Sequence, residues 1–272
     1  MTSRAPIGVF DSGVGGLTVL KALVAQLPRE RFVYLGDTAR LPYGTKSPET
    51  VVRYALQAAQ ALADFGVKCL VLACNTASAT GLGAVSERIR EVPVIGVIEP
   101  GAEAACRASR SGHIGVIATE GTVRGGAYQD AIVRRRSDAR VSAVPAQLFV
   151  ALAEEGLCRG PIADSVARHY LEPLFNSGTG SRPDTLVLGC THFPMLAQSI
   201  RAAAGPDVCI VDSAETTAQY VRQTLESENI AAGDGEGSLR LLATDAPERF
   251  ARIGARFLDR PIGPHEVELV DL

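Results

Sequence analysis

Lysine is scarce in this chain, and its scarcity argues against one large class of enzymes. The 272 residues include only Lys21, Lys46 and Lys68. Pyridoxal phosphate forms a Schiff base with a lysine in the active-site crevice. Lys46 is the sole candidate near the end of a predicted strand, and no phosphate-binding cup accompanies it. We therefore expect chemistry that needs no cofactor.

Long apolar runs, a leader pattern and a basic charge balance are missing as well. The apolar runs are strand-sized, well short of the ~18 residues that a membrane span needs, and "MTSRAPIGVFDSG" does not resemble a signal peptide. The net charge of −3 gives no bulk electrostatic case for nucleic acid or an anionic membrane. We therefore expect a cytoplasmic protein with neither kind of partner. The arginine run 134–136 is predicted to be a solvated helix face.

The cysteines lack the spacing of a metal or redox motif. They lie at positions 69, 74, 106, 158, 190 and 209 without a CxxC pair, so we predict no zinc ribbon and no other metal site. Cys69 and Cys74 point to opposite faces of a predicted strand and cannot share a metal or a disulfide. All six are expected to be reduced. Four of them are predicted to be inert core residues: Cys69, Cys106, Cys158 and Cys209.

Apolar runs of strand length alternate with helical patterns along the chain. Eight runs fit strands, at residues 7–10, 32–37, 69–74, 92–97, 113–119, 141–146, 185–190 and 208–213. They show no period-two alternation, so we expect parallel strands buried on both faces, with helices as crossovers. The predicted fold class is therefore α/β, in which functional groups gather at the carboxyl ends of the strands. The glycine-rich segments 176–184 and 231–238 are predicted to be loops.

One strand-and-thiol pattern occurs twice, as "LVLACNT" at 70–76 and as "LVLGCTH" at 186–192. The repeat predicts two similar lobes, each a mainly parallel sheet flanked by helices, with the active site in the cleft between them. We assign residues 1–98 plus 212–272 to the lobe that holds Cys74. Residues 99–211 then form the lobe that holds Cys190.

Both of these cysteines stand at predicted strand ends, before polar residues that can cap a helix. The positive end of a helix favours thiolate over thiol. A thiol with a pKa of ~8.5 is only about 3% ionised at pH 7, which costs about 2 kcal/mol. We expect a helix terminus or the neighbouring His192 to remove most of that cost. Two such bases on opposite sides of one carbon can invert a stereocentre.

The stretch "FDSGVGG" at 10–16 follows a predicted strand and opens a helix. It lacks the last glycine of GxGxxG, and no Gly-Lys-Ser/Thr follows, so it matches a phosphate loop poorly. Two interpretations stay open. Asp11 or Ser12 simply caps the helix, or Asp11 faces the crevice and holds a substrate ammonium group.

Six segments together resemble one family over essentially the whole chain. They are "IGVFDSGVGGLTVL" (7–20), "YLGDTARLPYGTKS" (34–47), "LVLACNTASA" (70–79), "VPVIGVIEPG" (92–101), "IGVIATEGTV" (114–123) and "LVLGCTHFP" (186–194). On these segments the chain resembles the glutamate racemases of the cofactor-independent aspartate/glutamate racemase family. The resemblance implies interconversion of L- and D-glutamate, the latter a building block of peptidoglycan. It also implies glutamate as the bound small molecule, and a homodimer.

The resemblance further implies roles for the motif residues. Cys74 would take the α-proton of D-glutamate and Cys190 that of L-glutamate, each with the other as proton donor. The residues that would bind substrate or assist the thiols are Asp11 and Ser12 (amino end), Asn75, Thr76 and Thr191 (α-carboxylate), the backbone of Tyr43 and Gly44 (side-chain carboxylate), and His192 and Asp11 (beside the thiols). Asp37, Thr119 and Thr122 are further candidates. Either Glu154 or Glu155 of "AEEG" would face the cleft.

Other interpretations remain. Tyr43 could be an ordinary turn residue at the surface, and His192 a core hydrogen-bonding residue. The substrate could be aspartate or a similar diacid, since the "PYG" loop sets the side-chain length. From other classes, the chain could be a two-lobed amino-acid binding module, or a redox sensor with a reversible disulfide between Cys74 and Cys190.

Overall fold

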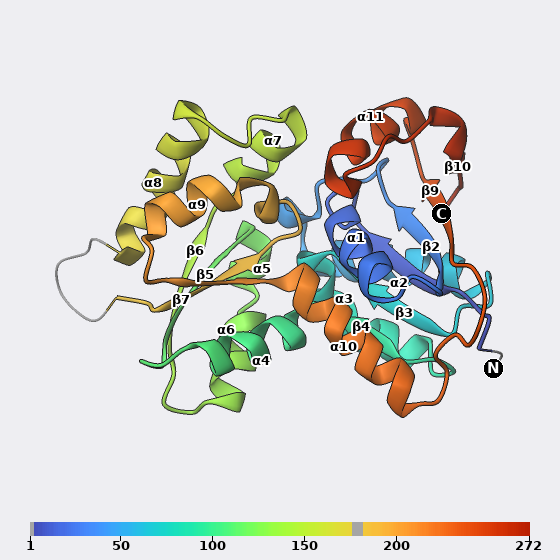
Figure 1. Ribbon diagram of the computed structural model, residues 1–272, viewed down its shortest axis with the longest axis horizontal. Helices are drawn as coiled ribbons and strands as arrows, with labels where there is room; N and C mark the ends of the chain where they lie inside the picture. Colours follow the sequence, from blue (N-terminus) through green and yellow to red (C-terminus); the bar gives the residue numbers. More distant parts are fainter. Residues whose placement is uncertain (1–2, 176–181) are drawn as a thin grey trace.

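Two parallel β-sheets form the framework of the computed structural model, which describes residues 3–175 and 182–272. The first sheet has the order β10-β9-β2-β1-β3-β4 and the second the order β6-β5-β7-β8. The strands of the first are β1 (Ile7–Asp11), β2 (Arg31–Gly36), β3 (Cys69–Leu72), β4 (Val94–Gly96), β9 (Ser238–Ala243) and β10 (Val267–Leu269). Those of the second are β5 (His113–Ala118), β6 (Arg140–Pro145), β7 (Thr185–Gly189) and β8 (Cys209–Asp212). Figure 1 shows the two sheets in separate halves of the molecule.

Burial on both faces explains why these strands read as unbroken apolar runs. Every residue of β1, β3, β5 and β7 is buried, and every strand pair is parallel. Neighbouring residues of β1 belong to different cores, with Val9 on one face of the sheet and Phe10 on the other. The predicted parallel α/β class is confirmed. Eight strands lie where the sequence indicated them.

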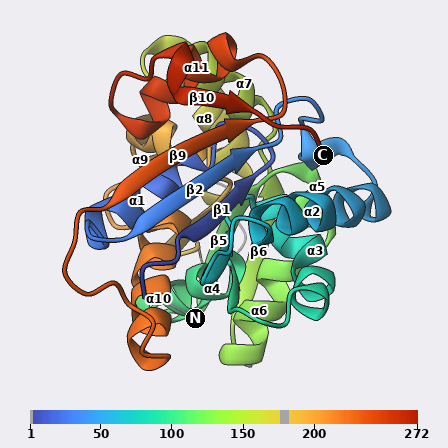
Figure 2. The ribbon, with the colours of Figure 1, turned by 90° about the vertical axis from the view of Figure 1, so that its right-hand side faces the viewer.

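Helices cover both faces of each sheet. Those around the first sheet are α1 (Leu17–Gln26), α2 (Pro48–Ala63), α3 (Asn75–Arg88), α10 (Ser213–Ser227) and α11 (Pro247–Leu258). Figure 2 shows α1 and α2 on opposite sides of the strands β1, β2 and β9. The second sheet is flanked by α4 (Ile98–Ala108), α5 (Glu120–Arg124), α6 (Ala127–Arg135), α7 (Leu148–Glu155), α8 (Pro161–Phe175) and α9 (Ala197–Ala204). Three short 3₁₀ helices complete the order: η1 (Tyr43–Thr45), η2 (Phe193–Leu196) and η3 (Pro264–Glu266).

The two sheets repeat one strand order, and this accounts for the repeated sequence pattern. The first four strands lie in the order β2-β1-β3-β4, and the next four in the order β6-β5-β7-β8. Cys74 follows β3 and Cys190 follows β7, which are equivalent strands. In both sheets the order in which successive strands are added reverses beside that strand. Such a switch point opens a crevice at the carboxyl ends of the strands.

Two sequence expectations differ from the structure. The strands β9 and β10 were not predicted, because β10 is only three residues long at the sheet edge and the first half of β9 is largely exposed. Cys209 is exposed rather than inert in the core, since β8 is an edge strand, and Cys106 and Cys158 are only half-buried. The arginine run does lie on a solvated helix face, since Arg134 and Arg135 are exposed in the last turn of α6, where both pair with Glu99.

Two further expectations concern loops and membranes. Most of the predicted loop 176–184 lies outside the described residues, whereas 231–237 holds neither helix nor strand and β9 begins at Ser238. Among the residues that the structure describes, no helix combines the length and the apolarity that crossing a membrane demands.

A buried ion pair ties three segments of the first sheet together. Lys68, just before β3, is fully buried, and its Nζ lies 2.6 Å from Glu30 Oε2. The same ammonium donates hydrogen bonds to the carbonyl oxygens of Ser3 and Ile230, both at 2.7 Å. Glu30 Oε1 accepts a bond from the Ala232 N–H at 2.6 Å. The pair therefore holds the connection between α10 and β9 against the sheet.

We expect the substitution Lys68→Met to destabilise the protein by about 3–5 kcal/mol, because it leaves the Glu30 charge buried without its partner. Lys21→Met is the matched control. It breaks a pair with Asp259 of similar length, 2.8 Å, but both side chains are at least half exposed, and such pairs contribute at most about 1 kcal/mol. Urea unfolding followed by circular dichroism measures both changes. Equal losses in the two variants would contradict this account of the buried pair.

Candidate active site

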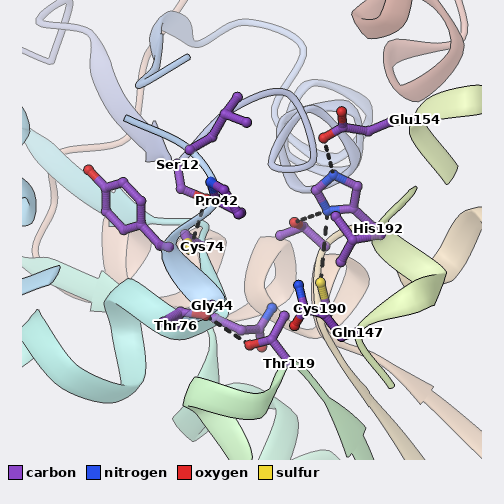
Figure 3. Close-up of a pocket in the computed structure, with 16 residues that line it drawn as sticks. Ser12, Pro42, Gly44, Cys74, Thr76, Thr119, Gln147, Glu154, Cys190 and His192 are labelled. Atoms are coloured by element: carbon purple, nitrogen blue, oxygen red, sulfur yellow. Dashed lines mark hydrogen bonds and ion pairs between the residues drawn. The ribbon is translucent and has the colours of Figure 1, made fainter. Parts of the chain in front are cut away.

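A cavity lies between the two sheets, at the carboxyl ends of their strands. It is lined by Ser12, Gly13, Leu41, Pro42, Tyr43, Gly44, Cys74, Asn75, Thr76, Thr119, Gln147, Val150, Glu154, Cys190, Thr191 and His192. Figure 3 shows Cys74 and Cys190 on opposite sides of this space. The two matched motifs of the sequence therefore meet at one site.

Four strand ends supply most of the polar groups. Ser12 follows β1, and Cys74 with its neighbours follows β3. From the second sheet, Thr119 follows β5, and Cys190 with its neighbours follows β7. In each sheet these are two adjacent inner strands, between which the strand order reverses. The cavity thus combines the switch-point crevices of both sheets.

Cys74 is held at the start of α3. Its Sγ accepts a hydrogen bond from the Ala77 N–H at 3.5 Å, so the cysteine itself caps the helix, whereas the predicted caps Asn75 and Thr76 are the first two helical residues. Its thiol also lies 3.4 Å from the Ser12 hydroxyl. Burial, helped by the charge of nearby Asp11, nevertheless raises the pKa of the Cys74 thiol to about 12. The expectation that a helix terminus would lower the cost of this thiolate is wrong for the closed cavity, because desolvation outweighs one N–H.

Cys190 has different surroundings. Its strand is followed by the 3₁₀ helix η2, with Pro194 in the first turn, and α9 begins only at Ala197. The prediction that Thr191 or His192 caps a helix is therefore wrong, since His192 precedes η2 without a capping side-chain hydrogen bond. Instead, Cys190 Sγ lies 3.8 Å from His192 Nδ1. A cationic imidazole there stabilises a negative sulfur directly.

His192 is the middle of a chain of side chains that starts at Cys190. Its Nε2 lies 3.3 Å from Glu154 Oε1, and Figure 3 shows the three groups in sequence along one wall. Burial lowers the pKa of His192, but the hydrogen bonds to Cys190 and Glu154 and the surrounding negative charges outweigh it, and the pKa rises to about 10. The alternative of an uninvolved core histidine does not fit a ring that touches the thiol.

The structure resolves which glutamate of "AEEG" faces the cleft. Glu154 lines the cavity, whereas Glu155 is exposed to solvent. Burial tends to raise the pKa of Glu154, but the hydrogen bonds and positive charges of His192 and Arg249 lower it overall. Glu154 is therefore an anion placed to stabilise the His192 cation.

Asp11 lies beneath the cavity wall and does not line it. Its Oδ2 accepts a hydrogen bond from the Gly13 N–H at 2.9 Å, while its Oδ1 is buried without a hydrogen-bond partner among the described residues. Burial raises its pKa, although the charge of His192 lowers it. The carboxyl group is thus close enough to influence both Cys74 and His192. Its predicted contact with a substrate ammonium stays a prediction.

Tyr43 is anchored from behind by Asp37. The Tyr43 ring is buried, and its hydroxyl donates to Asp37 Oδ2. Asp37 also accepts from Arg40 Nε at 2.7 Å and from the Thr244 hydroxyl at 3.0 Å. The alternative of a surface turn residue is therefore wrong for Tyr43. Asp37 does not line the cavity but fixes the loop that does.

Gly44 permits a close approach between this loop and the second sheet. A Cβ atom there would lie 2.9 Å from the Thr119 Cβ, which is too close for any other residue. The hydroxyl groups of Thr76, Thr119 and Thr122 hydrogen-bond to one another at 3.0–3.2 Å. Thr122 stays outside the cavity lining and supports the other two.

Asn75 is oriented by a residue from the other sheet. The Tyr128 hydroxyl on α6 donates to Asn75 Oδ1 at 2.8 Å, and the Asn75 Nδ2 is left buried without a hydrogen-bond partner in the described chain. A fixed, unsatisfied N–H donor at the cavity wall suits a carboxylate.

Sequence reasoning missed several residues of the site. Gln147 and Val150 line the cavity, and Tyr128 and Arg249 hold lining residues in place. Only Gln147 and Val150 had a local signal, since they precede "AEEG" on one helical segment. The described residues hold no cluster of His, Cys, Asp or Glu side chains that could bind a metal ion.

We expect Glu154→Gln to lower the pKa of His192, because it removes the negative charge next to Nε2. A folded-state pKa above the ordinary 6.5 means that the His192 cation stabilises the fold at pH below 6.5, and this contribution is lost as the pH rises toward 10. Proton–carbon NMR of ¹³C-histidine-labelled protein, assigned with a His192→Asn variant, measures the titration midpoint. Glu155→Gln is the matched control and should leave the midpoint unchanged. An unchanged midpoint in Glu154→Gln would exclude Glu154 as the cause of the shift.

The sequence and the fold are similar to those of known racemases. Residues 7–221 match the model of the family described as Asp/Glu/hydantoin racemase. The chain is 49% identical to a glutamate racemase of Geobacter metallireducens over 94% of each sequence.

Two solved structures are also similar. The glutamate racemase of Thermus thermophilus with β-chloro-D-alanine has 46% identity and a TM-score of 0.89 over 100% of this chain and 99% of the other. That of Francisella tularensis with D-glutamate has 36% identity and a TM-score of 0.90 over 99% and 98%. The chain belongs to the Asp/Glu/hydantoin racemase family.

Proposed function

We propose that this racemase interconverts L- and D-glutamate with two cysteines and no cofactor. The observation that carries the proposal is the pair of buried thiols, Cys74 and Cys190, on opposite sides of one cavity. Two bases on opposite faces of a carbon are the arrangement that inversion requires. The choice of glutamate is supported by the similar proteins, which bear the name glutamate racemase, and by the relative that holds D-glutamate.

The two thiols begin the L-to-D reaction in different protonation states. The high pKa of Cys74 keeps it as a thiol, whereas Cys190 Sγ lies 3.8 Å from the imidazole of His192, whose own pKa is raised. The Cys190 thiolate takes the α-proton of L-glutamate, and the electron pair of the C–H bond is left on the α-carbon. Cys74 then gives its proton to the opposite face, which yields D-glutamate and a Cys74 thiolate. The D-to-L reaction runs through the same steps in reverse.

The carbanion needs fixed donors in a water-poor space, because the α-proton is far less acidic than a thiol. We assign the α-carboxylate to Asn75, Thr76 and Thr191, whose donors surround the cavity between the thiols. The unpartnered Asn75 Nδ2 is one of these donors. Asp11 and Ser12 would hold the ammonium group, and the backbone N–H groups of Tyr43 and Gly44 the side-chain carboxylate.

We propose that the lobes of residues 1–98 plus 212–272 and of residues 99–211 move apart to admit the substrate. Both sheets contribute to the cavity walls, so their separation opens the site and their return excludes water.

A role in peptidoglycan synthesis, a cytoplasmic location and a homodimer complete the proposal. Each stays a prediction, and light scattering after size-exclusion chromatography tests the last.

Circular dichroism of L-glutamate tests the proposed reaction. The purified protein, without added cofactor, should bring the signal to zero, and in D₂O the product should carry deuterium at the α-carbon. L-aspartate under the same conditions is the control for substrate length, and we expect its turnover to be at least about tenfold lower, a difference of ~1.4 kcal/mol. Faster turnover of aspartate would favour the diacid alternative. Stoichiometric glutamate binding with a stable signal would favour a binding module.

We expect Cys74→Ser and Cys190→Ser each to abolish racemisation, because serine is too weak an acid to replace either thiol. Each variant keeps one base and should still eliminate chloride from one enantiomer of β-chloroalanine. Release of pyruvate, coupled to lactate dehydrogenase, measures the elimination for each enantiomer. Full racemase activity in either variant would refute the two-base scheme. Loss of elimination from the same enantiomer in both variants would refute the opposite placement of the bases.

A further inference from the structure

An ion pair crosses the cleft beside the site. Arg249 lies on α11, which covers the first sheet, and Glu154 lies on α7, beside the second. Arg249 Nη2 is 2.8 Å from Glu154 Oε2. Figure 1 shows α7 and α11 at the tops of the two halves of the molecule. Arg249 therefore joins the two halves at one wall of the cavity.

The Glu154 carboxylate is divided between two partners. Its Oε1 faces His192 Nε2 at 3.3 Å, and its Oε2 is held by Arg249. The Glu154 side chain is 15% exposed, so a carboxylate released from Arg249 could rotate toward water. An arginine fixes both the charge and the direction of a carboxylate. In this position Arg249 keeps Oε1 directed at the histidine.

The hydrogen bonds of this chain of contacts lead to one of the two thiols. It runs from Arg249 through Glu154 and His192 to Cys190. Cys74 has separate hydrogen-bond partners, the Ser12 hydroxyl and the Ala77 N–H, which lie in the first sheet's half of the site. A change at Arg249 should therefore alter proton transfer mainly at the face of the substrate that Cys190 serves.

We propose that Arg249 is a positioning residue that reaches across the cleft and orients Glu154 and His192 for proton transfer at Cys190. The inference rests on the proposed two-base racemase. Arg249 does not line the cavity, so its action is indirect.

Racemisation alone does not isolate this effect. The equilibrium constant between enantiomers is one, so any substitution changes kcat/KM equally in the two directions. Elimination from β-chloroalanine is irreversible and uses one base for each enantiomer. The thiolate takes the α-proton, the C–H electron pair forms a C=C bond, and chloride leaves with the C–Cl pair. The aminoacrylate tautomerises to an imine, which water hydrolyses to pyruvate and ammonia.

The experiment compares elimination from β-chloro-L-alanine and β-chloro-D-alanine in the full-length protein. The enantiomer that Cys74→Ser still consumes defines the substrate of Cys190. For Arg249→Met we expect kcat/KM on that enantiomer to fall about three- to tenfold, with less than about a twofold change on the other. Arg249→Lys keeps the charge and should recover part of the loss. Arg252→Met, an exposed arginine on the same helix and outside the cavity, is the matched control and should leave both rates unchanged.

The ratio of the two rates is measured within one protein sample, so it does not depend on how much of the variant is folded. An equal loss on both enantiomers, or no loss on either, would overturn the role of Arg249. Failure of the proposed function has a different signature: the unsubstituted protein would then neither racemise glutamate nor eliminate chloride.

Discussion

Desolvation of two thiols in one closed cavity is the constraint on which the rest of the site depends. Exclusion of water strengthens every hydrogen bond to a developing carbanion. The same exclusion penalises the thiolate that must start the reaction, and burial raises the pKa of Cys74 accordingly. At the other sulfur the structure places the His192 ring, whose Nδ1 lies 3.8 Å from Cys190 Sγ. Because both sulfurs are buried, their charge states depend on the polar groups that lie beside them.

A repeated scaffold supports this unequal pair of thiols. The strand orders of the two sheets match, and both cysteines follow equivalent strands. The segments beyond the strands differ, since β3 leads straight into α3 whereas β7 leads into η2. A helix N–H therefore reaches Cys74, and an imidazole reaches Cys190. The shared topology brings the sulfurs to one cavity, and the local turns give each its own chemistry.

Contacts between the two halves complete the site. Tyr128 orients Asn75, and Arg249 holds Glu154, each across the boundary between the sheets. The threonine hydroxyl cluster joins the same two halves. These bonds hold only while the sheets are close, so separation of the two halves would break all three contacts.

The sequence by itself determined the α/β class, eight of the strands and the placement of the two thiol motifs at strand ends. It could do so because strands that are buried on both faces have unbroken apolar sequences. It also indicated Ser12, Tyr43, Asn75 and His192, which lie beside those ends. Only the tertiary structure decided between Glu154 and Glu155, and brought Tyr128 and Arg249 to the site. Those contacts join segments 53 and 95 residues apart, and no local pattern encodes a hydrogen bond across such a separation. The tertiary structure also reversed the expected direction of the Cys74 pKa shift, because that shift depends on how completely the folded chain excludes water.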